Sequence, residues 1–320
     1  MKLTRSCAIL LTCAIGVAGL AHAQPQPYPA RPITVMSWVE PGSALDIFAR
    51  TIARHLSREL GQNTIVENRP GADGIILINY LLKQPADGYT LAVNTNTLAS
   101  HFSEPAPTFT FKPEDLQMVA RSQIDPYSLV VPGESPFKSL DDVIKAARSN
   151  PNKLNIGGGL QLSGLRVFWE IFSELGKIET NWIAYKGSAP TMTAVVGRQV
   201  DAAILNPGLI KQMVTVGKLR IIAVSADSRL TDFPEIPTFR ELGWNVVRYQ
   251  WRGVMTKAGL PQATLDKLTE AIRRSQQTPE WKAYLKQESI TDGFLNAAEF
   301  KSQLMQDTAE TQAIRKRLGL

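Results

Sequence analysis

The sequence predicts an α/β protein, because strand-like and helix-like segments alternate along nearly all of it. Short runs rich in β-branched residues, such as 33–38 and 219–225, indicate strands. They alternate with helix-like stretches whose apolar residues recur every three or four positions, such as 44–60. This alternation is typical of mainly parallel sheets covered by helices. No long linker interrupts it, so a chain of two domains would have to pass between them on short segments.

Taken in chain order, each expected element follows from its residue pattern and its flanking turns. The expected strands are 33–38, 63–67, 89–94, 127–131, 154–157, 181–184, 201–205, 219–225 and 248–255. The expected helices are 44–60, 75–83, 138–149, 163–175, 188–197, 207–216, 261–276, 278–287 and 297–316. Pro85-Ala86-Asp87-Gly88 forms a turn before the strand at 89, Ser149-Asn150-Pro151-Asn152 ends a helix, and Pro261 begins one.

These elements group into two expected domains with a ligand cleft between them. Residues 24–124 would form the N-terminal part of domain 1 and residues 125–225 domain 2, and 226–320 would return to domain 1 with the C-terminal helices. Strand-to-helix loops would then wall the cleft, which is where ligands lie in open α/β sheets.

The N-terminus has the features of a signal peptide. Lys2 and Arg5 precede an uncharged stretch at 8–20, and Ala21-His22-Ala23 supplies a small-x-small cleavage pattern. We therefore expect a periplasmic protein cleaved after Ala23; lipid attachment at Cys13 is the alternative. Cleavage removes both cysteines, Cys7 and Cys13, so the mature chain would have no disulfide and no thiol chemistry.

The residues typical of enzymes are largely missing from the rest of the chain. His55, expected to be an ordinary exposed helix residue, and His101 are the histidines left, and no zinc-binding spacing occurs. Gly157-Gly158-Gly159 lacks the Gly-Lys-Ser/Thr of a phosphate loop, and Gln161 stands where a Ser163 nucleophile would need glycine. The formal charge of +6 comes from scattered residues, which does not favour nucleic-acid binding. We expect no metal and no cofactor.

One turn does predict a binding site. The strand at 33–38 is followed by Pro41-Gly42-Ser43-Ala44 and then by the helix at 44–60. Such a turn directs free backbone N–H groups and the positive end of the helix dipole at one point. A small anion, such as a carboxylate, would be held there without a charged side chain.

Several short motifs follow one another along the chain. In order, the motifs are Pro41-Gly42-Ser43-Ala44-Leu45-Asp46, Val66-Glu67-Asn68-Arg69-Pro70-Gly71-Ala72, Asp87-Gly88-Tyr89-Thr90-Leu91, Tyr185-Lys186-Gly187-Ser188-Ala189-Pro190, Gly197-Arg198-Gln199-Val200-Asp201, Gly217-Lys218-Leu219-Arg220, Pro234-Glu235-Ile236-Pro237-Thr238 and Ala258-Gly259-Leu260-Pro261. They span essentially the whole mature chain. In this order and spacing they resemble one family, the extracytoplasmic solute receptors of tripartite tricarboxylate transporters, also called the Bordetella uptake gene family.

This resemblance implies a two-domain flytrap of periplasmic-binding-protein type II. Such a protein is no enzyme; it acts as a monomer and delivers a small mono- or dicarboxylate to membrane permease subunits. The implied ligand-binding residues are Pro41, Gly42, Ser43, Ala44 and Asp46 at the first loop, Asn94, Thr95 and Asn96 in domain 1, and Gly158, Ser163, Tyr185, Lys186, Gly187 and Asn206 in domain 2. Asp46 could instead complement the helix N-terminus, or pair with the ammonium group of an amino-acid ligand.

Departures from the family pattern bear on the ligand. Ser43 and Asp73 replace glycines, and Trp38 replaces a common phenylalanine. Trp38, Leu160 and Leu162 would give an apolar cleft, which favours a ligand with an aromatic or hydrocarbon body over citrate. Arg166 is either a solvated helix residue or a bidentate partner for a second carboxylate across the cleft. Trp38 and Trp251 follow the pattern of cleft edges.

Two other functions remain open at this stage. A flytrap can present its liganded form to a membrane receptor as a sensor, which needs the same closing cleft as transport. A secreted α/β enzyme acting on small acids would need a nucleophile or base, and the scarcity of histidine and cysteine argues against it.

Overall fold

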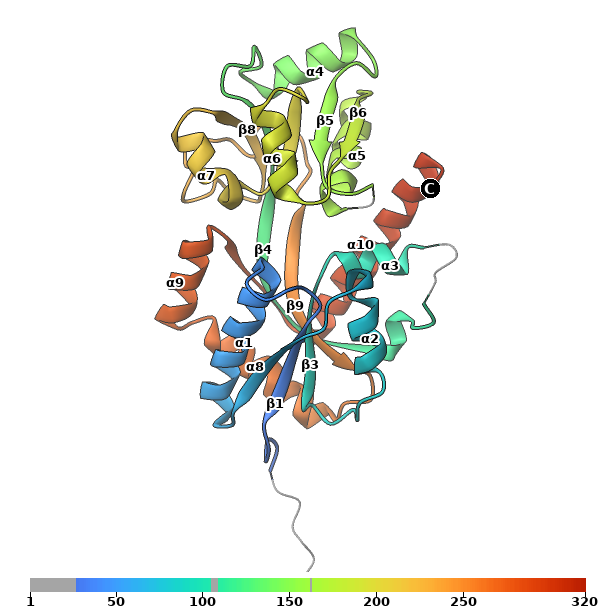
Figure 1. Ribbon diagram of the computed structural model, residues 1–320, viewed down its shortest axis with the longest axis vertical. Coiled ribbons are helices and arrows are strands. Elements are labelled where there is room, and N and C mark those ends of the chain that lie inside the picture. Colours follow the sequence, from blue (N-terminus) through green and yellow to red (C-terminus); the bar gives the residue numbers. More distant parts are fainter. Residues whose placement is uncertain (1–26, 105–108, 162) are drawn as a thin grey trace, which may run out of the picture.

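A computed structural model describes residues 27–104, 109–161 and 163–320. The expected signal peptide, its cleavage site after Ala23 and the side chain of Leu162 lie outside the described residues. Within the described part, no helix is both long enough and apolar enough to cross a membrane. The chain forms two lobes, a lower and an upper one as drawn in Figure 1.

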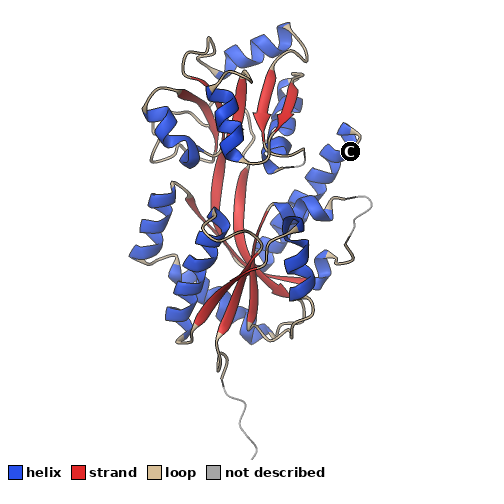
Figure 2. Ribbon diagram, viewed as in Figure 1, coloured by secondary structure: helices blue, strands red, loops and turns tan. Residues whose placement is uncertain are grey.

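The lower lobe is built on parallel strands β1 (Ile33–Ser37), β2 (Thr64–Asn68) and β3 (Thr90–Thr95), extended by antiparallel β9 (Tyr249–Lys257). Helices α1 (Ala44–Leu60), α8 (Gln262–Ser275) and α9 (Pro279–Glu288) cover one face around Phe48 and Trp281. Helices α2 (Ile75–Leu81), α3 (Thr97–Phe102) and α10 (Ala297–Leu318) cover the other face around Met36 and Phe300. Figure 2 shows the strands between these two layers.

The upper lobe repeats the same three-layer arrangement. Strands β5 (Asn155–Gly158), β6 (Asn181–Ala184) and β7 (Ala202–Leu205) are parallel, and β8 (Leu219–Ser225) runs antiparallel to the end of β4 (Leu116–Pro132). Helices α4 (Leu140–Ser149) and α5 (Gly164–Gly176) pack on one face, with Phe168 and Trp169 in the core. Helices α6 (Ser188–Val196) and α7 (Pro207–Thr215) pack on the other, around Val195 and Ile210.

Strand β4 (Leu116–Pro132) passes through both lobes. Its residues 116–126 pair with β9, and β10 (Thr291–Leu295) adds to the same part; its residues 127–132 pair with β8. The chain returns to the lower lobe later than residue 226, where the sequence analysis placed the start of the return. Phe239 and Val246 are buried in the upper lobe, so the chain re-enters the lower lobe only near Arg248, at the start of β9.

Most elements lie within a few residues of their predicted positions, but a few differ. Helix α1 has the predicted bounds, whereas β4 begins eleven residues before the predicted 127 because it continues through the crossing. The sequence prediction missed α3 and β10. His55 was expected to be exposed but is 3% exposed and packs edge-on against Trp281, and burial lowers its pKa. Trp251 was expected at a cleft edge and is instead fully buried.

Candidate functional site

The carboxyl ends of parallel strands from both lobes meet at one cavity of about 380 Å³. Residues following β1 and β3 line it from below, and residues following β5, β6 and β7 line it from above, which is the usual ligand position in open α/β sheets. The lining residues are Trp38, Asp73, Thr95, Asn96, Thr97, Ser100, His101, Glu104, Gly159, Leu160, Ser163, Gly164, Leu165, Gly187, Ser188, Asn206, Gln250 and Arg315. We call it the interlobe cavity.

Part of the predicted ligand set is brought together there. Trp38, Thr95, Asn96, Ser163, Gly187 and Asn206 line the interlobe cavity. The rest of the set does not line it, namely Pro41, Gly42, Ser43, Ala44, Asp46, Asn94, Gly158, Arg166, Tyr185 and Lys186. The end of α1 that carries Ser43 and Ala44 still points toward the upper lobe (Figure 1).

Asp46 organises the Pro-Gly loop from inside. Its carboxylate is 1% exposed and accepts hydrogen bonds from the Gly42 N–H, from Asn68 Nδ2 and from Arg50 Nε, each at 2.8 Å. Burial raises the pKa of Asp46, but the hydrogen bonds from Arg50, Gly42 and Asn68 outweigh burial and hold that pKa below its usual value. The sequence predicted free N–H groups at this turn, but the Gly42 N–H donates to Asp46, and the Asp46 carboxylate is engaged by three donors within the loop.

The residues at the end of β3 and just after it are held by hydrogen bonds to their neighbours. Asn96 Oδ1 accepts from the Trp251 N–H at 2.7 Å, and Asn96 Nδ2 donates to the Tyr249 carbonyl at 3.3 Å. Thr95 Oγ1 lies 3.1 Å from Thr97 Oγ1. Asn94 is 3% exposed and its Oδ1 accepts from the Thr95 N–H, so it shapes the loop rather than facing the cavity.

The glycine-rich turn after β5 has a packing role in part. A Cβ on Gly158 would lie 2.2 Å from the ring of Trp182, so only glycine fits against that indole. The Gly158 carbonyl accepts from the Tyr185 N–H, and the half-buried Tyr185 side chain packs against the core of the upper lobe. Ser163 begins α5 and its Oγ accepts from the Arg166 N–H at 3.4 Å. Lys186 is exposed outside the interlobe cavity.

Arg166 does not reach across the interlobe cavity, which corrects the bidentate-partner hypothesis. Its Nε lies 3.2 Å from Glu170 Oε1, and its guanidinium carbon lies 5.9 Å from the Trp182 ring centre. Glu170 in turn pairs with Arg317 of α10 at 3.1 Å. Arg166 thus belongs to an ion-pair group that joins α5 of the upper lobe to the C-terminal helix.

The structure adds cavity residues that the sequence did not reveal. Asp73 lies in a turn where four successive residues, 71–74, have positive φ, and its own φ is 50°. The Asp73 carbonyl oxygen lies 3.0 Å from His101 Nε2, so that nitrogen carries the proton and donates. Trp38 lies against Gly74, whose Cβ would be 3.1 Å from the indole. Trp38 Nε1 and Arg315 Nε are buried without a hydrogen-bond partner among the described residues.

Strands β4 and β9, which connect the two lobes, carry a buried acid–base pair next to the interlobe cavity. Asp125 of β4 and Arg252 of β9 are each 8% exposed, with Oδ2 and Nη2 3.8 Å apart. Asn206, which lines the cavity, donates from Nδ2 to the Asp125 and Pro126 carbonyls. Burial raises the pKa of Asp125 to about 6, although Arg252 and Asn206 act in the opposite direction.

This raised pKa predicts a pH dependence of stability. The pKa of aspartate in an unfolded chain is about 4. The contribution of Asp125 to the free energy of unfolding is therefore fully present below about pH 4 and is lost as pH rises through about 6. Asp125→Asn lacks this titration, so its free energy of unfolding should improve relative to that of the wild type as pH rises from about 4 to about 7. Urea unfolding of both proteins across that range measures the difference; parallel curves would contradict it.

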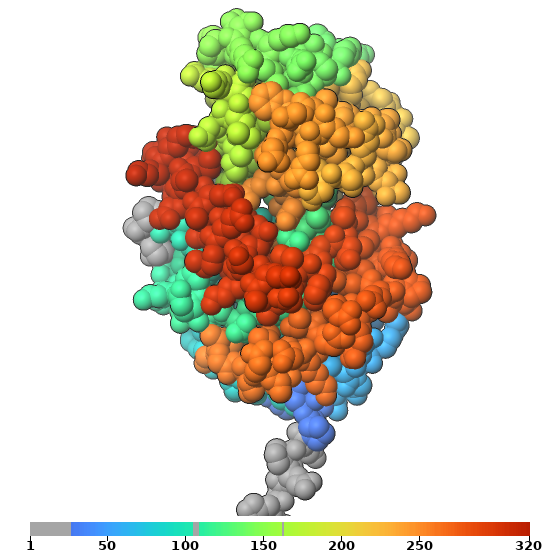
Figure 3. Space-filling model, turned by 180° about the vertical axis from the view of Figure 1, so that it is seen from behind, coloured from blue at the N-terminus to red at the C-terminus, as the bar shows by residue number. Residues whose placement is uncertain are grey.

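A larger hollow of about 590 Å³ opens on the back of the molecule, between the loop at 225–233 and the segment at 285–292 (Figure 3). It lies behind the part of β4 and β9 that connects the lobes, away from the carboxyl ends of β1, β3 and β5–β7. None of its lining side chains has a buried polar atom without a partner. The interlobe cavity is therefore the better candidate site.

This architecture and sequence are similar to those of known proteins. A family model described as the tripartite tricarboxylate transporter family receptor matches residues 48–320. Protein BugT of Bordetella pertussis is 32% identical over 283 residues, which cover 87% of this chain and 86% of that protein. A TctC solute-binding protein from Polaromonas, solved without ligand, matches with a TM-score of 0.81 at 22% identity, covering 91% of this chain and 99% of its own.

A second solved structure carries a ligand. An R. palustris protein with adipate matches with a TM-score of 0.75 at 25% identity, covering 91% of this chain and 98% of that chain. The family match extends over most of the sequence and agrees with the two-lobed α/β fold. This chain belongs to the receptors of the tripartite tricarboxylate transporter family, which are periplasmic solute-binding proteins and not enzymes.

Proposed function

We propose that this receptor captures a small organic carboxylate in the interlobe cavity and delivers it to a tripartite membrane permease. The observation that carries the proposal is the position of this cavity, where strand ends of both lobes meet and the Trp38 indole N–H has no partner within residues 27–104, 109–161 and 163–320. A volume of about 380 Å³ suits a small molecule. The adipate bound by the R. palustris relative is a ligand of this chemical class.

The lining favours a ligand with an apolar body. Leu160, which is 50% exposed, and Leu165 face the cavity from above, and Trp38 faces it from below. A hydrocarbon chain or an aromatic ring would bury surface against these side chains, whereas citrate would place polar groups there.

We propose that the receptor works as a monomer after cleavage behind Ala23, with the two lobes moving relative to each other.

Thermal unfolding with a series of acids tests this proposal. Adipate, benzoate and citrate should be compared with adipamide, which keeps the adipate skeleton without charge. A ligand at about 100 times its Kd stabilises the folded state by about 2.7 kcal/mol, which raises Tm measurably. We expect adipate or benzoate to raise Tm more than citrate and adipamide to leave it unchanged. Absence of a shift with every acid would refute carboxylate capture.

A glycine substitution tests whether the Pro-Gly loop takes part. Gly42 has φ 84° and its N–H is held by Asp46, so Gly42→Val should displace the loop and abolish acid binding. Gly61→Val is a matched control, because Gly61 ends the same helix with φ 67° and equally open space. Both variants should lose similar stability, with binding lost only at position 42. Equal affinity in both, measured by calorimetry, would place the loop outside the site.

Delivery to a permease needs a test in cells. Loss of the receptor gene should abolish uptake of the radiolabelled acid that binds, and a plasmid copy should restore it. Unchanged uptake together with a lost transcriptional response to the acid would indicate a sensor instead.

A further inference from the structure

Arg315 differs from Arg248 and Arg317, two other arginines that contact or belong to α10, in having a buried nitrogen without a partner and no ion pair among the described contacts. It lies near the end of α10, lines the interlobe cavity, and its Nε is buried without a hydrogen bond. Arg317, two residues further on, pairs with Glu170 and Glu174 of α5. Arg248 pairs with Asp307 and Glu310. Within the described residues, Arg315 is thus a cationic side chain of the cavity with unsatisfied hydrogen-bonding capacity.

The buried Nε of Arg315 is in an unfavourable position as long as it has no acceptor. A buried N–H that loses its water without gaining an acceptor costs free energy, and a ligand oxygen would restore the bond. Arginine suits a carboxylate particularly well, since its planar fork donates two parallel hydrogen bonds. Arg315 is therefore a donor that a carboxylate would satisfy.

The acidic residues of the same cavity do not fill this role. Asp73 is exposed, and the Glu104 side chain is 30% exposed with its Oε1 3.7 Å from His101 Nδ1. Neither forms an ion pair with Arg315 among the described contacts. Both carboxylates are accessible to solvent, whereas the Arg315 Nε is buried.

We propose that Arg315 binds a second carboxylate of the ligand and makes this receptor select dicarboxylates over monocarboxylates. The inference rests on the proposed function and adds a residue that selects among acids. Trp38 comes from the end of β1 in the lower lobe, and Arg315 comes from the end of α10, where Arg317 holds the helix against the upper lobe. A ligand with an acid group at each end, and a hydrocarbon chain beside Leu160 and Leu165, would satisfy both donors.

Isothermal titration calorimetry on three proteins and three probes tests this assignment. The proteins are the wild type, Arg315→Gln and Lys316→Gln; Lys316 is the exposed neighbour on the same helix, so its variant loses the same charge outside the cavity. The probes are adipate, hexanoate and 6-aminohexanoate, which share a six-carbon chain and differ at one end. Circular dichroism and Tm confirm that each variant is folded.

We expect Arg315→Gln to weaken adipate by roughly 30-fold and hexanoate by less than about threefold, because only adipate loses a charge partner. Lys316→Gln should bind all three probes like the wild type. Equal losses for adipate and hexanoate, or none, would overturn the role of Arg315 while leaving carboxylate capture intact. Tighter binding of 6-aminohexanoate than of adipate would overturn it in favour of Asp73 and Glu104 as partners for an ammonium group. If the wild type binds none of the three probes and no acid of the Tm series raises its Tm, carboxylate capture falls as well.

Discussion

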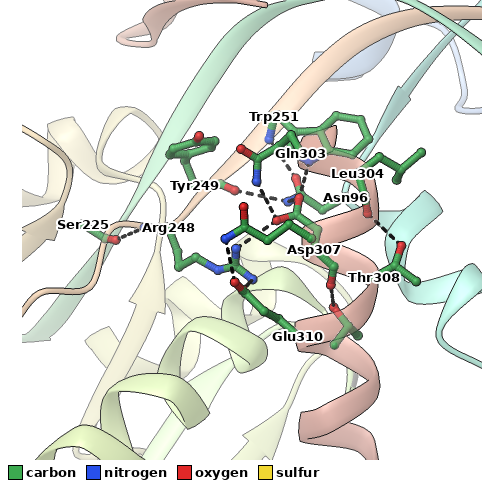
Figure 4. A network of polar contacts seen from close by, with 12 residues as sticks. Asn96, Ser225, Arg248, Tyr249, Trp251, Gln303, Leu304, Asp307, Thr308 and Glu310 are labelled. Carbon is green, nitrogen blue, oxygen red and sulfur yellow. Dashed lines mark hydrogen bonds and ion pairs between the residues drawn. The ribbon is translucent and has the colours of Figure 1, made fainter. Parts of the chain in front are cut away.

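Replacing Asp307 by alanine should lower the free energy of unfolding by about 4 kcal/mol. Asp307 is 3% exposed and lies at the centre of the network in Figure 4. Its carboxylate accepts from Trp251 Nε1 at 2.7 Å, from Arg248 Nη1 at 2.9 Å and from Gln303 Nε2 at 2.9 Å. Without that carboxylate, a largely buried guanidinium and a fully buried indole N–H would lose their acceptors, which is far more damaging than the loss of a surface ion pair.

Glu310 supplies the control for this prediction. It is the other acidic partner of Arg248, on the next turn of α10, but its side chain is 34% exposed. Glu310→Ala should therefore cost less than about 1 kcal/mol. Urea unfolding of the two variants at neutral pH measures the difference. Similar losses in both would mean that the network is not held by Asp307.

Asp307 also connects stability to the site. The network reaches Asn96 at the cavity wall, and Arg248 at the return crossing donates its N–H to Ser225 Oγ of the upper lobe. It therefore fixes α10, and Arg315 near the end of that helix, relative to the crossing strands.

Asp46→Ala is expected to cost about 3 kcal/mol, because it removes a buried carboxylate that accepts hydrogen bonds from the Gly42 N–H and from the Asn68 amide. The arrangement of the Pro-Gly loop should be lost with it. Since hydrogen bonds depress the pKa of Asp46, its contribution is present above the unfolded pKa of about 4 and is lost as pH falls through the folded value.

Arg50→Ala separates the exposed part of this arrangement from the buried part. The Arg50 side chain is 50% exposed, and its removal leaves the bonds from Gly42 and Asn68 in place, so the loss should stay below about 1 kcal/mol. Thermal and urea unfolding at pH about 7 give both values under one condition. A loss for Asp46→Ala no larger than that for Arg50→Ala would show that the loop is held by other contacts.

The fold could be predicted well where local patterns carry it. Helix α1 follows from the spacing of Leu45, Phe48, Ile52 and Leu56 after a Pro-Gly turn, and all of these residues are buried. Strand β10, with Thr291-Asp292-Gly293, has exposed residues at its start and no alternating apolar pattern, so it could not be recognised. Helix α3 has six residues and directly follows β3, which leaves too little sequence for a period to show.

The site could be predicted only in part, because its contacts join distant segments. The position of Trp38, Asn96 and Asn206 at strand ends followed from a familiar order of motifs. Gly42 and Asp46 are only four residues apart. The hydrogen bond between them could have been suspected from an aspartate in the first turn of a helix. The cavity role of Arg315 depends on how α10 crosses from one lobe to the other, and no local signal encodes it.

Helix α10 packs Phe300 and Leu304 into the lower lobe, while Arg317 near its far end pairs with Glu170 and Glu174 of the upper lobe. Any rotation that separates the lobes must do electrostatic work against these pairs. Exposed pairs of this kind contribute about 0.2–1 kcal/mol and are screened by dissolved ions. The proposed movement of the two lobes would therefore become easier as the salt concentration around the protein rises.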